Sequence, residues 1–66
     1  MLNMSEKTRE FLKRYLPDTL DAADVNDILI PLYLWIDMHG FTEDYEYNEL
    51  GKLGQEVYDD LYYNND

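Results

Sequence analysis

Residues 28–36 read Ile28-Leu29-Ile30-Pro31-Leu32-Tyr33-Leu34-Trp35-Ile36, a run without a charged side chain. At about 100° per residue, this stretch is apolar on every side of a helix, and such helices are normally buried. A buried strand is the alternative, because the run lacks alternation. No second stretch of comparable character exists to pair with it. We therefore expect a helix here and an all-α fold.

On a helical wheel the apolar residues of this segment divide into two faces. One face, expected to point into the core, carries Ile28, Leu29, Leu32, Trp35 and Ile36. The far side carries Ile30, Leu34 and Met38, which should meet water in a small bundle. These three form a candidate apolar interface for a homodimer or a partner helix. In the alternative, residues 19–27, or Leu2 and Met4, fold back over them.

The helical segment around this run should begin at Asp18 or Thr19, both good caps, and end at Gly40. Pro31 interrupts it, because proline lacks an N–H and its ring crowds the carbonyl group of Asp27. We expect either a kink at Pro31 or two helices, at about 19–27 and 28–39.

Two further helices are expected on either side. The first starts at the cap Ser5 and ends before Pro17, and the third runs from Thr42 to about Tyr62. The apolar stripe of the third is Leu50, Leu53, Val57 and Leu61, where Gly54 permits close helix approach and Gly51 marks a break or an edge. The sequence predicts one domain over residues 1–66, a bundle of three helices, or four if split at Pro31, with a frayed tail at 64–66.

Charge narrows the choice of partner. Fifteen acidic residues against five basic ones give a net charge of -10, and four of the basic residues lie within residues 1–17. A field of this sign disfavours direct binding to nucleic acid or anionic lipid. We expect a basic protein as partner.

Catalytic, metal and cofactor sites are not expected. The chain has no cysteine, and its single histidine, His39, is expected to end a helix. Asp18, Asp21, Asp24 and Asp27 recur every third residue, but a calcium loop starting at Asp18 would need glycine at position 23 and glutamate at position 29, where alanine and leucine stand. Neither a glycine-rich phosphate loop, nor a signal peptide, nor a bilayer-spanning run is present, so we expect a cytoplasmic protein.

Acidic residues and tyrosines alternate in the C-terminal third. One interpretation is a solvated face of carboxylates, with Tyr47, Tyr58 and Tyr62 at the edge of the core. The other is a partner-binding surface, because tyrosine is enriched at interfaces and carboxylates steer a basic partner. The candidate residues for that surface are Tyr45, Glu49, Glu56, Asp60 and Tyr63.

The sequence thus predicts a non-catalytic, acidic protein-binding or regulatory module, and an enzyme is a much weaker alternative. A DNA-mimic inhibitor of a nucleic-acid-binding protein is another alternative. However, acids at positions 49, 56 and 60 give three charges over about 16 Å of helix, whereas DNA carries one per ~1.7 Å. In composition alone the chain resembles small accessory proteins of bacteria, phages and mobile elements, some of which inhibit host defence enzymes.

Overall fold

Three α-helices and one short 3-10 helix make up most of the computed structural model, which describes residues 2–65. In chain order they are α1 (Glu6–Tyr15), η1 (Pro17–Asp21), α2 (Asn26–His39) and α3 (Glu49–Asn64). This part of the chain has no strand, only an isolated bridge between Phe41 and Tyr47. The all-α prediction is confirmed, and the buried-strand alternative for residues 28–36 is wrong.

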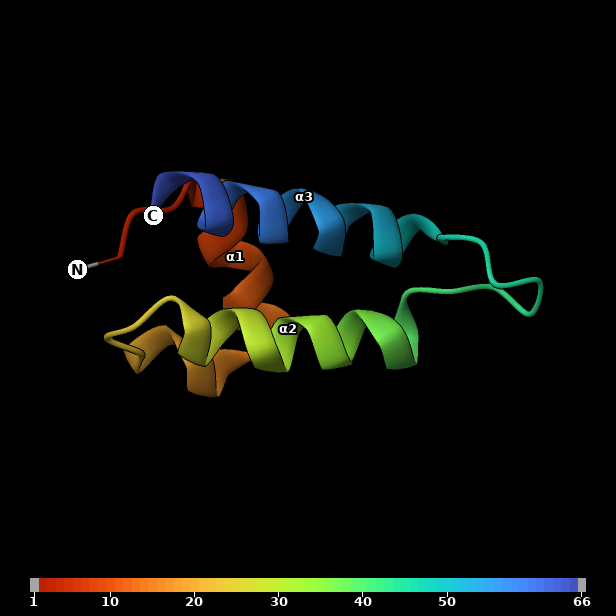
Figure 1. Ribbon diagram of the computed structural model, residues 1–66, viewed down its shortest axis with the longest axis horizontal. Coiled ribbons are helices and arrows are strands. Elements are labelled where there is room, and N and C mark those ends of the chain that lie inside the picture. Colours follow the sequence, from red (N-terminus) through yellow and green to blue (C-terminus); the bar gives the residue numbers. More distant parts are fainter. Residues whose placement is uncertain (1, 66) are drawn as a thin grey trace.

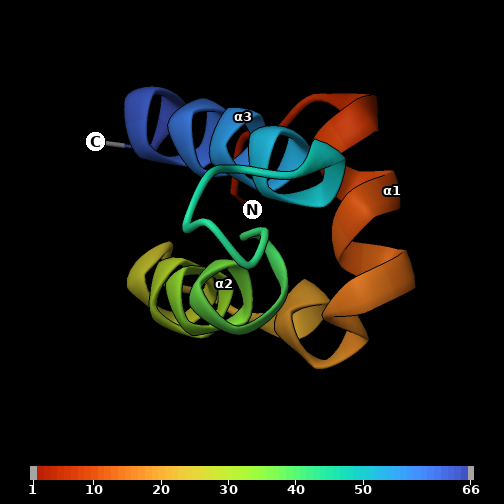
Figure 2. The same cartoon turned by 90° about the vertical axis from the view of Figure 1, so that its right-hand side faces the viewer.

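Helices α2 and α3 run antiparallel as a hairpin, joined by the loop of residues 40–48 (Figure 1). Helix α1 crosses one side of this hairpin and contacts α3, while η1 continues from it beside α2 (Figure 2). The opposite side of the hairpin carries no helix (Figure 2). The molecule therefore has a side that α1 covers and a side that it leaves open.

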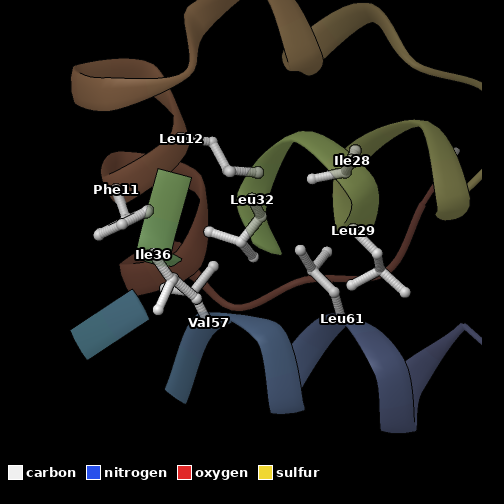
Figure 3. Packing of buried hydrophobic residues seen from close by; sticks show 8 residues of the cluster. All are labelled: Phe11, Leu12, Ile28, Leu29, Leu32, Ile36, Val57 and Leu61. Atoms are coloured by element: carbon white, nitrogen blue, oxygen red, sulfur yellow. The ribbon is translucent and has the colours of Figure 1, made fainter. Parts of the chain in front are cut away.

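The core lies where the three α-helices meet. Because apolar residues recur every three or four positions, each helix turns one stripe toward this centre. Figure 3 shows the eight buried apolar side chains: Phe11, Leu12, Ile28, Leu29, Leu32, Ile36, Val57 and Leu61. The predicted core face of residues 28–36 is confirmed, with Trp35 half-buried at its edge. Between residues 2 and 65, no helix has both the length and the apolar character to cross a membrane.

The beginning of α1 follows the prediction from local sequence. Ser5 is the N-cap, and its hydroxyl oxygen accepts a hydrogen bond from the Thr8 N–H at 3.2 Å. Lys13 and Arg14 in the last turn face the negative end of the helix dipole. The helix ends at Tyr15, and Pro17 begins η1.

Helix α2 passes through Pro31 without a break, so the predicted alternative of a split at Pro31 is wrong. The interruption lies at residues 22–25, between η1 and α2. There Val25 is the N-cap of α2, and Asp24 just before it accepts a hydrogen bond from the Asn26 N–H at 2.9 Å. Proline removes only the bond to the carbonyl group of Asp27, an exposed residue in the first turn, where water can replace it. Burial of Ile28 before Pro31 and Leu32 after it holds both parts in one helix.

The third helix begins at Glu49 rather than at Thr42, so that predicted start is wrong. Asn48 is the N-cap: its side-chain oxygen accepts from the Gly51 N–H at 2.7 Å, and its side-chain nitrogen donates to the His39 carbonyl group at 3.0 Å. Residues 41–47 instead form a tight loop in which Tyr45 has a left-handed φ of 62°. Asn48 can cap both helix ends at once, an advantage that Thr42 does not have.

The two helices of the hairpin approach each other most closely at two glycines. A Cβ atom at Gly51 would overlap the carbonyl oxygen of Gly40, and one at Gly54 would lie 2.8 Å from Cγ1 of Ile36. The predicted close approach at Gly54 is present, and the one at Gly51 is closer still. Gly51 lies in the first turn of α3 and marks the contact that closes the hairpin, not a break in the helix.

The end of α3 is tied to the N-terminal segment. Asn65 accepts a hydrogen bond from the Asn3 N–H and donates one to the Asn3 carbonyl group, both at 2.6 Å. Asn64 lies in the last turn of the helix. The sequence predicts a frayed tail over residues 64–66, but Asn64 and Asn65 are hydrogen-bonded, and Asp66 lies outside the described residues.

Candidate functional site

The outward face of α2 carries four large apolar or aromatic side chains in contact with solvent. Ile30, Tyr33, Leu34 and Met38 are exposed to 63%, 64%, 54% and 76% of their surface. Tyr33, Leu34 and Met38 follow Ile30 by three, four and eight residues, which places the four in one continuous row, here called the outer stripe. The row combines the predicted candidates Ile30, Leu34 and Met38 with Tyr33.

No part of the described chain folds over the outer stripe. Leu2 and Met4, which the sequence offered as a cover, pack against the core. Residues 17–21 form η1 on the side of α1, where Thr19 is buried (Figure 2). The predicted intramolecular alternative is therefore wrong for residues 2–65.

Beside the outer stripe, a hollow of about 300 Å³ opens between α2, the loop and the middle of α3. It is here called the aromatic hollow, because four of its side chains are aromatic and one is a carboxylate. Its lining residues are Tyr33, Ile36, Asp37, Phe41, Tyr47, Gln55 and Tyr58. None of them belongs to α1, so the hollow faces away from the covered side.

The loop fixes the aromatic rings of the hollow. Phe41 and Tyr47 face each other across the β-bridge and stack at 4.8 Å between ring centroids. The Thr42 N–H donates to the carbonyl group of Glu46 at 2.7 Å, which closes the loop behind the two rings. The left-handed Tyr45 makes this closure possible, because it reverses the chain between residues 42 and 46.

Polar groups at the hollow are arranged to accept hydrogen bonds. The Tyr47 hydroxyl group donates to the side-chain oxygen of Gln55 at 3.4 Å, and the Gln55 amide nitrogen donates to Asp59 at 3.1 Å. Asp37 is exposed and is the one charged residue of the lining. Within the described chain all lysines and arginines lie on α1 except Lys52, which does not line the hollow.

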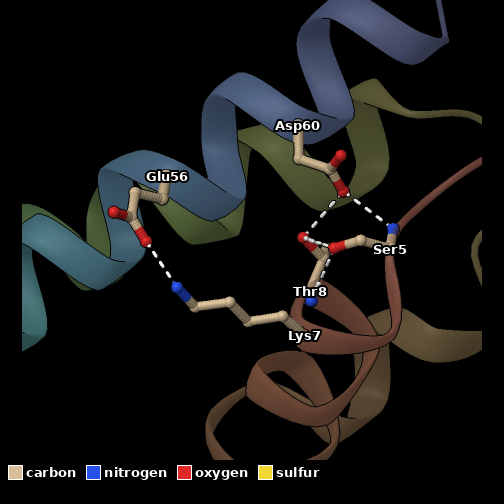
Figure 4. Close-up of polar contacts among 5 residues, drawn as sticks. All are labelled: Ser5, Lys7, Thr8, Glu56 and Asp60. Carbon is tan, nitrogen blue, oxygen red and sulfur yellow. Dashed lines mark hydrogen bonds and ion pairs between the residues drawn. The ribbon is translucent and has the colours of Figure 1, made fainter.

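The predicted acidic and aromatic surface has a different environment. Figure 4 shows that two of its carboxylates turn toward α1. Asp60 accepts hydrogen bonds from the Ser5 N–H at 2.9 Å and the Thr8 hydroxyl group at 2.7 Å. Glu56 pairs with Lys7 at 2.8 Å. These contacts join α3 to α1, so the two acids have roles within the fold.

The contacts of Asp60 also set its acidity. The Ser5 N–H, then the Thr8 hydroxyl group, hold the pKa of Asp60 below its ordinary value, and partial burial opposes them weakly. Thr8 is buried, so its hydroxyl group needs this acceptor. The Ser5 hydroxyl group in turn donates to the Thr8 oxygen at 3.2 Å. Asp60 is thus a hydrogen-bonded support for the start of α1.

The other three candidates of that surface are not brought together as a patch. Glu49 is exposed in the first turn of α3, and Tyr63 is 73% exposed near its end. Tyr45 is 88% exposed in the loop, outside any helix. The prediction that these residues bind a partner stays a prediction. In the structure they lie in separate places and do not form the single surface that the sequence suggested.

His39 and the regularly spaced aspartates form no cluster with a chemical role in the described residues. The His39 ring lies 5.4 Å from the Trp35 ring, at the end of α2 as expected from the sequence. Residues 2–65 contain no group of three histidine or acidic side chains placed to hold a metal ion. Of the four spaced aspartates, Asp24 supports the start of α2 and Asp27 lies in its first turn.

Sequence reasoning missed the aromatic hollow, which gathers residues from three separate segments. The sequence contained one local indication of the hollow. Tyr33 and Asp37 are four residues apart on α2, and that spacing puts both on one helix face. Tyr47 and Tyr58 were expected at the edge of the core on one helix. Their convergence depends on the loop, which the helical interpretation of residues 42–48 excluded.

Comparisons with models of known protein families, with curated proteins and with solved structures found no significant match.

Proposed function

We propose that the chain is a non-catalytic binding module that docks a basic protein on the open side of the α2–α3 hairpin. The observation that carries this proposal is the outer stripe, a row of exposed apolar side chains with carboxylates at both ends. Asp27 lies at its beginning, Asp37 lies within it, and Glu43 and Asp44 follow it in the loop. Exposed apolar patches bordered by polar residues are typical of interaction sites.

The charges favour a basic partner over a second copy of the chain. In a two-fold dimer with antiparallel α2 helices, the acidic beginning of one stripe would meet the acidic loop of the other. Each copy also carries a net charge of -10. A partner with an apolar face bordered by lysine or arginine meets neither obstacle, and opposite charge would steer its approach.

The DNA-mimic alternative gains no support from the geometry. Of the three carboxylates on α3 that it would use, Glu56 is paired with Lys7, and Asp60 is bonded to Ser5 and Thr8. Only Glu49 of the three stays free of such contacts in the described chain. An enzymatic role gains no support from the aromatic hollow either, since its lining holds a single carboxylate and no histidine.

Capture from lysate of the native cells tests this proposal, with elution by rising salt. The variants are Leu34→Asp in the outer stripe and Tyr63→Asp on α3, which add the same charge at exposed positions. We expect the wild type and Tyr63→Asp to retain a lysine- and arginine-rich protein that Leu34→Asp releases. If Tyr63→Asp loses the partner and Leu34→Asp retains it, the binding site lies on α3 and not on the outer stripe.

Three further outcomes test the proposed partner and its site. With the purified partner, the association rate should fall between about 50 and about 300 mM salt, because exposed charges are screened within ~10 Å at 0.1 M. A flat rate contradicts a steered basic partner. Unfolding of Leu34→Asp would show that Leu34 is core, and conversion of a wild-type dimer to a monomer would show that a second copy occupies the stripe.

A further inference from the structure

We propose that the aromatic hollow holds an arginine side chain of the basic partner. This inference rests on the proposed function, because it names the group by which that partner is anchored. The hollow, at about 300 Å³, lies at the lower end of the range of small-ligand pockets. It suits one side chain better than a large ligand.

The aromatic rings that line the hollow favour a cation. An aromatic ring is negative on its face, so a cation within about 6 Å of the ring centre is attracted to it. Tyr33, Phe41, Tyr47 and Tyr58 come from three segments and line one space. Planar guanidinium groups also stack on such rings, and the stacking of Phe41 on Tyr47 holds two of the rings in place.

The polar groups select the same ligand. A guanidinium group has five N–H donors and no acceptor, so it needs a site made of acceptors. Asp37 can receive two parallel N–H bonds from it, and the Gln55 side-chain oxygen has a lone pair left after accepting from Tyr47. A carboxylate ligand would be repelled by Asp37, and an apolar one would leave that charge without a partner.

Arginine fits this combination better than lysine does. The ammonium group of lysine is compact and strongly hydrated, whereas the guanidinium group loses water more readily and is flat. A flat cation can lie against a ring and still direct two N–H groups at Asp37. The hollow therefore discriminates between two side chains of equal charge.

A titration of the whole isotope-labelled chain with three peptides tests this inference by NMR. The probes are acetyl-Ala-Arg-Ala-amide, its lysine counterpart, and its citrulline counterpart, which keeps the shape of arginine without the charge. We expect the arginine peptide to shift the amide signals of Asp37, Phe41, Tyr47 and Gln55. Its affinity should exceed that of the lysine peptide about two- to fivefold, and the citrulline peptide should cause no saturable shift.

Three variants locate the binding. Asp37→Asn and Tyr33→Leu change exposed lining residues, so both should fold, and both should weaken the arginine peptide at least about threefold. Asp44→Asn removes the same charge from an exposed loop residue outside the lining and should leave the affinity unchanged. Thermal unfolding of each variant verifies that the fold is retained.

Equal affinity for the arginine and lysine peptides, or equal weakening by Asp37→Asn and Asp44→Asn, would overturn the inference, because binding would then reflect net charge alone. Such a result would not contradict the proposed binding of a basic protein at the outer stripe. Conversely, the peptides could show selective arginine binding while Leu34→Asp captures the partner as well as the wild type does. That combination would contradict the proposed function and support the hollow as an arginine site.

Discussion

The two sides of the α2–α3 hairpin are built from the same helices and have opposite characters. On the covered side, α1 brings Phe11 and Leu12 into the core and joins α3 through Asp60 (Figures 3 and 4). On the open side, Tyr33 is exposed and lines the aromatic hollow, and Met38 is exposed on the outward face of α2. Among the described residues, α1 is the one α-helix outside the hairpin, and it covers one side. The difference separates residues that stabilise the fold from residues available for binding.

The largest expected effect comes from truncating a core residue and an outer-stripe residue in the same way. Leu12→Ala should reduce the free energy of unfolding by about 2 to 5 kcal/mol, because a fully buried side chain leaves a cavity. Ile30→Ala should change it by less than about 0.5 kcal/mol, since Ile30 is exposed. Urea unfolding of both variants measures the contrast. Equal losses would mean that the open side is also packed.

Gly51 tests the contact that closes the hairpin and so places both sides. Gly51→Ala should reduce the free energy of unfolding by about 1 to 3 kcal/mol, because the new methyl group would overlap the Gly40 carbonyl oxygen. An exposed helix position would instead gain up to about 1 kcal/mol from the same change. Thermal unfolding decides the sign, and stabilisation would show that the two glycines are not in contact.

A smaller effect is expected at Asp60, the polar support of the covered side. Asp60→Asn keeps an acceptor for Ser5 and Thr8 but loses the charge, so we expect a loss of about 1 kcal/mol at pH 7. Glu49→Gln, an exposed acid in the first turn of α3, is the control for a change of charge and should cost less.

The same variant carries a pH signature. The folded pKa of Asp60 is lowered, so its stabilisation is complete above the unfolded value of about 3.9 and is lost as the pH falls below it toward the folded pKa. The difference in unfolding free energy between wild type and Asp60→Asn should therefore shrink below about pH 4. A difference that stays constant down to pH 2 would show that the charge of Asp60 has no role.

Local patterns predicted the faces of the helices better than the contacts between distant segments. The Ser5 cap and the two faces of α2 each depend on residues within a few turns, and the structure has both. The exposure of Ile30, Leu34 and Met38 followed from the same wheel. Local patterns did not predict which of two possible N-caps, Thr42 or Asn48, begins the third helix.

That choice determined the candidate site. Asn48 is the N-cap because its side chain also donates a hydrogen bond to the carbonyl group of His39 at the end of α2. These two residues are nine positions apart in the sequence. Once residues 41–47 form a loop, Tyr47 joins Tyr33 and Tyr58 at one hollow, and Tyr45 is an exposed loop residue outside α3. Asp60 was expected on a binding surface because nothing in its own helix reveals Thr8 as its partner.

The central claim is that one side of the hairpin is closed and the other is uncovered, and solvent accessibility of methyl groups tests it most directly. A neutral gadolinium chelate broadens NMR signals according to their exposure. In dilute solution it should strongly broaden the methyl signals of Ile30, Leu34 and Met38, and leave those of Leu12, Ile28 and Leu32 sharp. Equal protection of both groups of methyls would contradict the account, because the outer stripe would then be buried in the free protein.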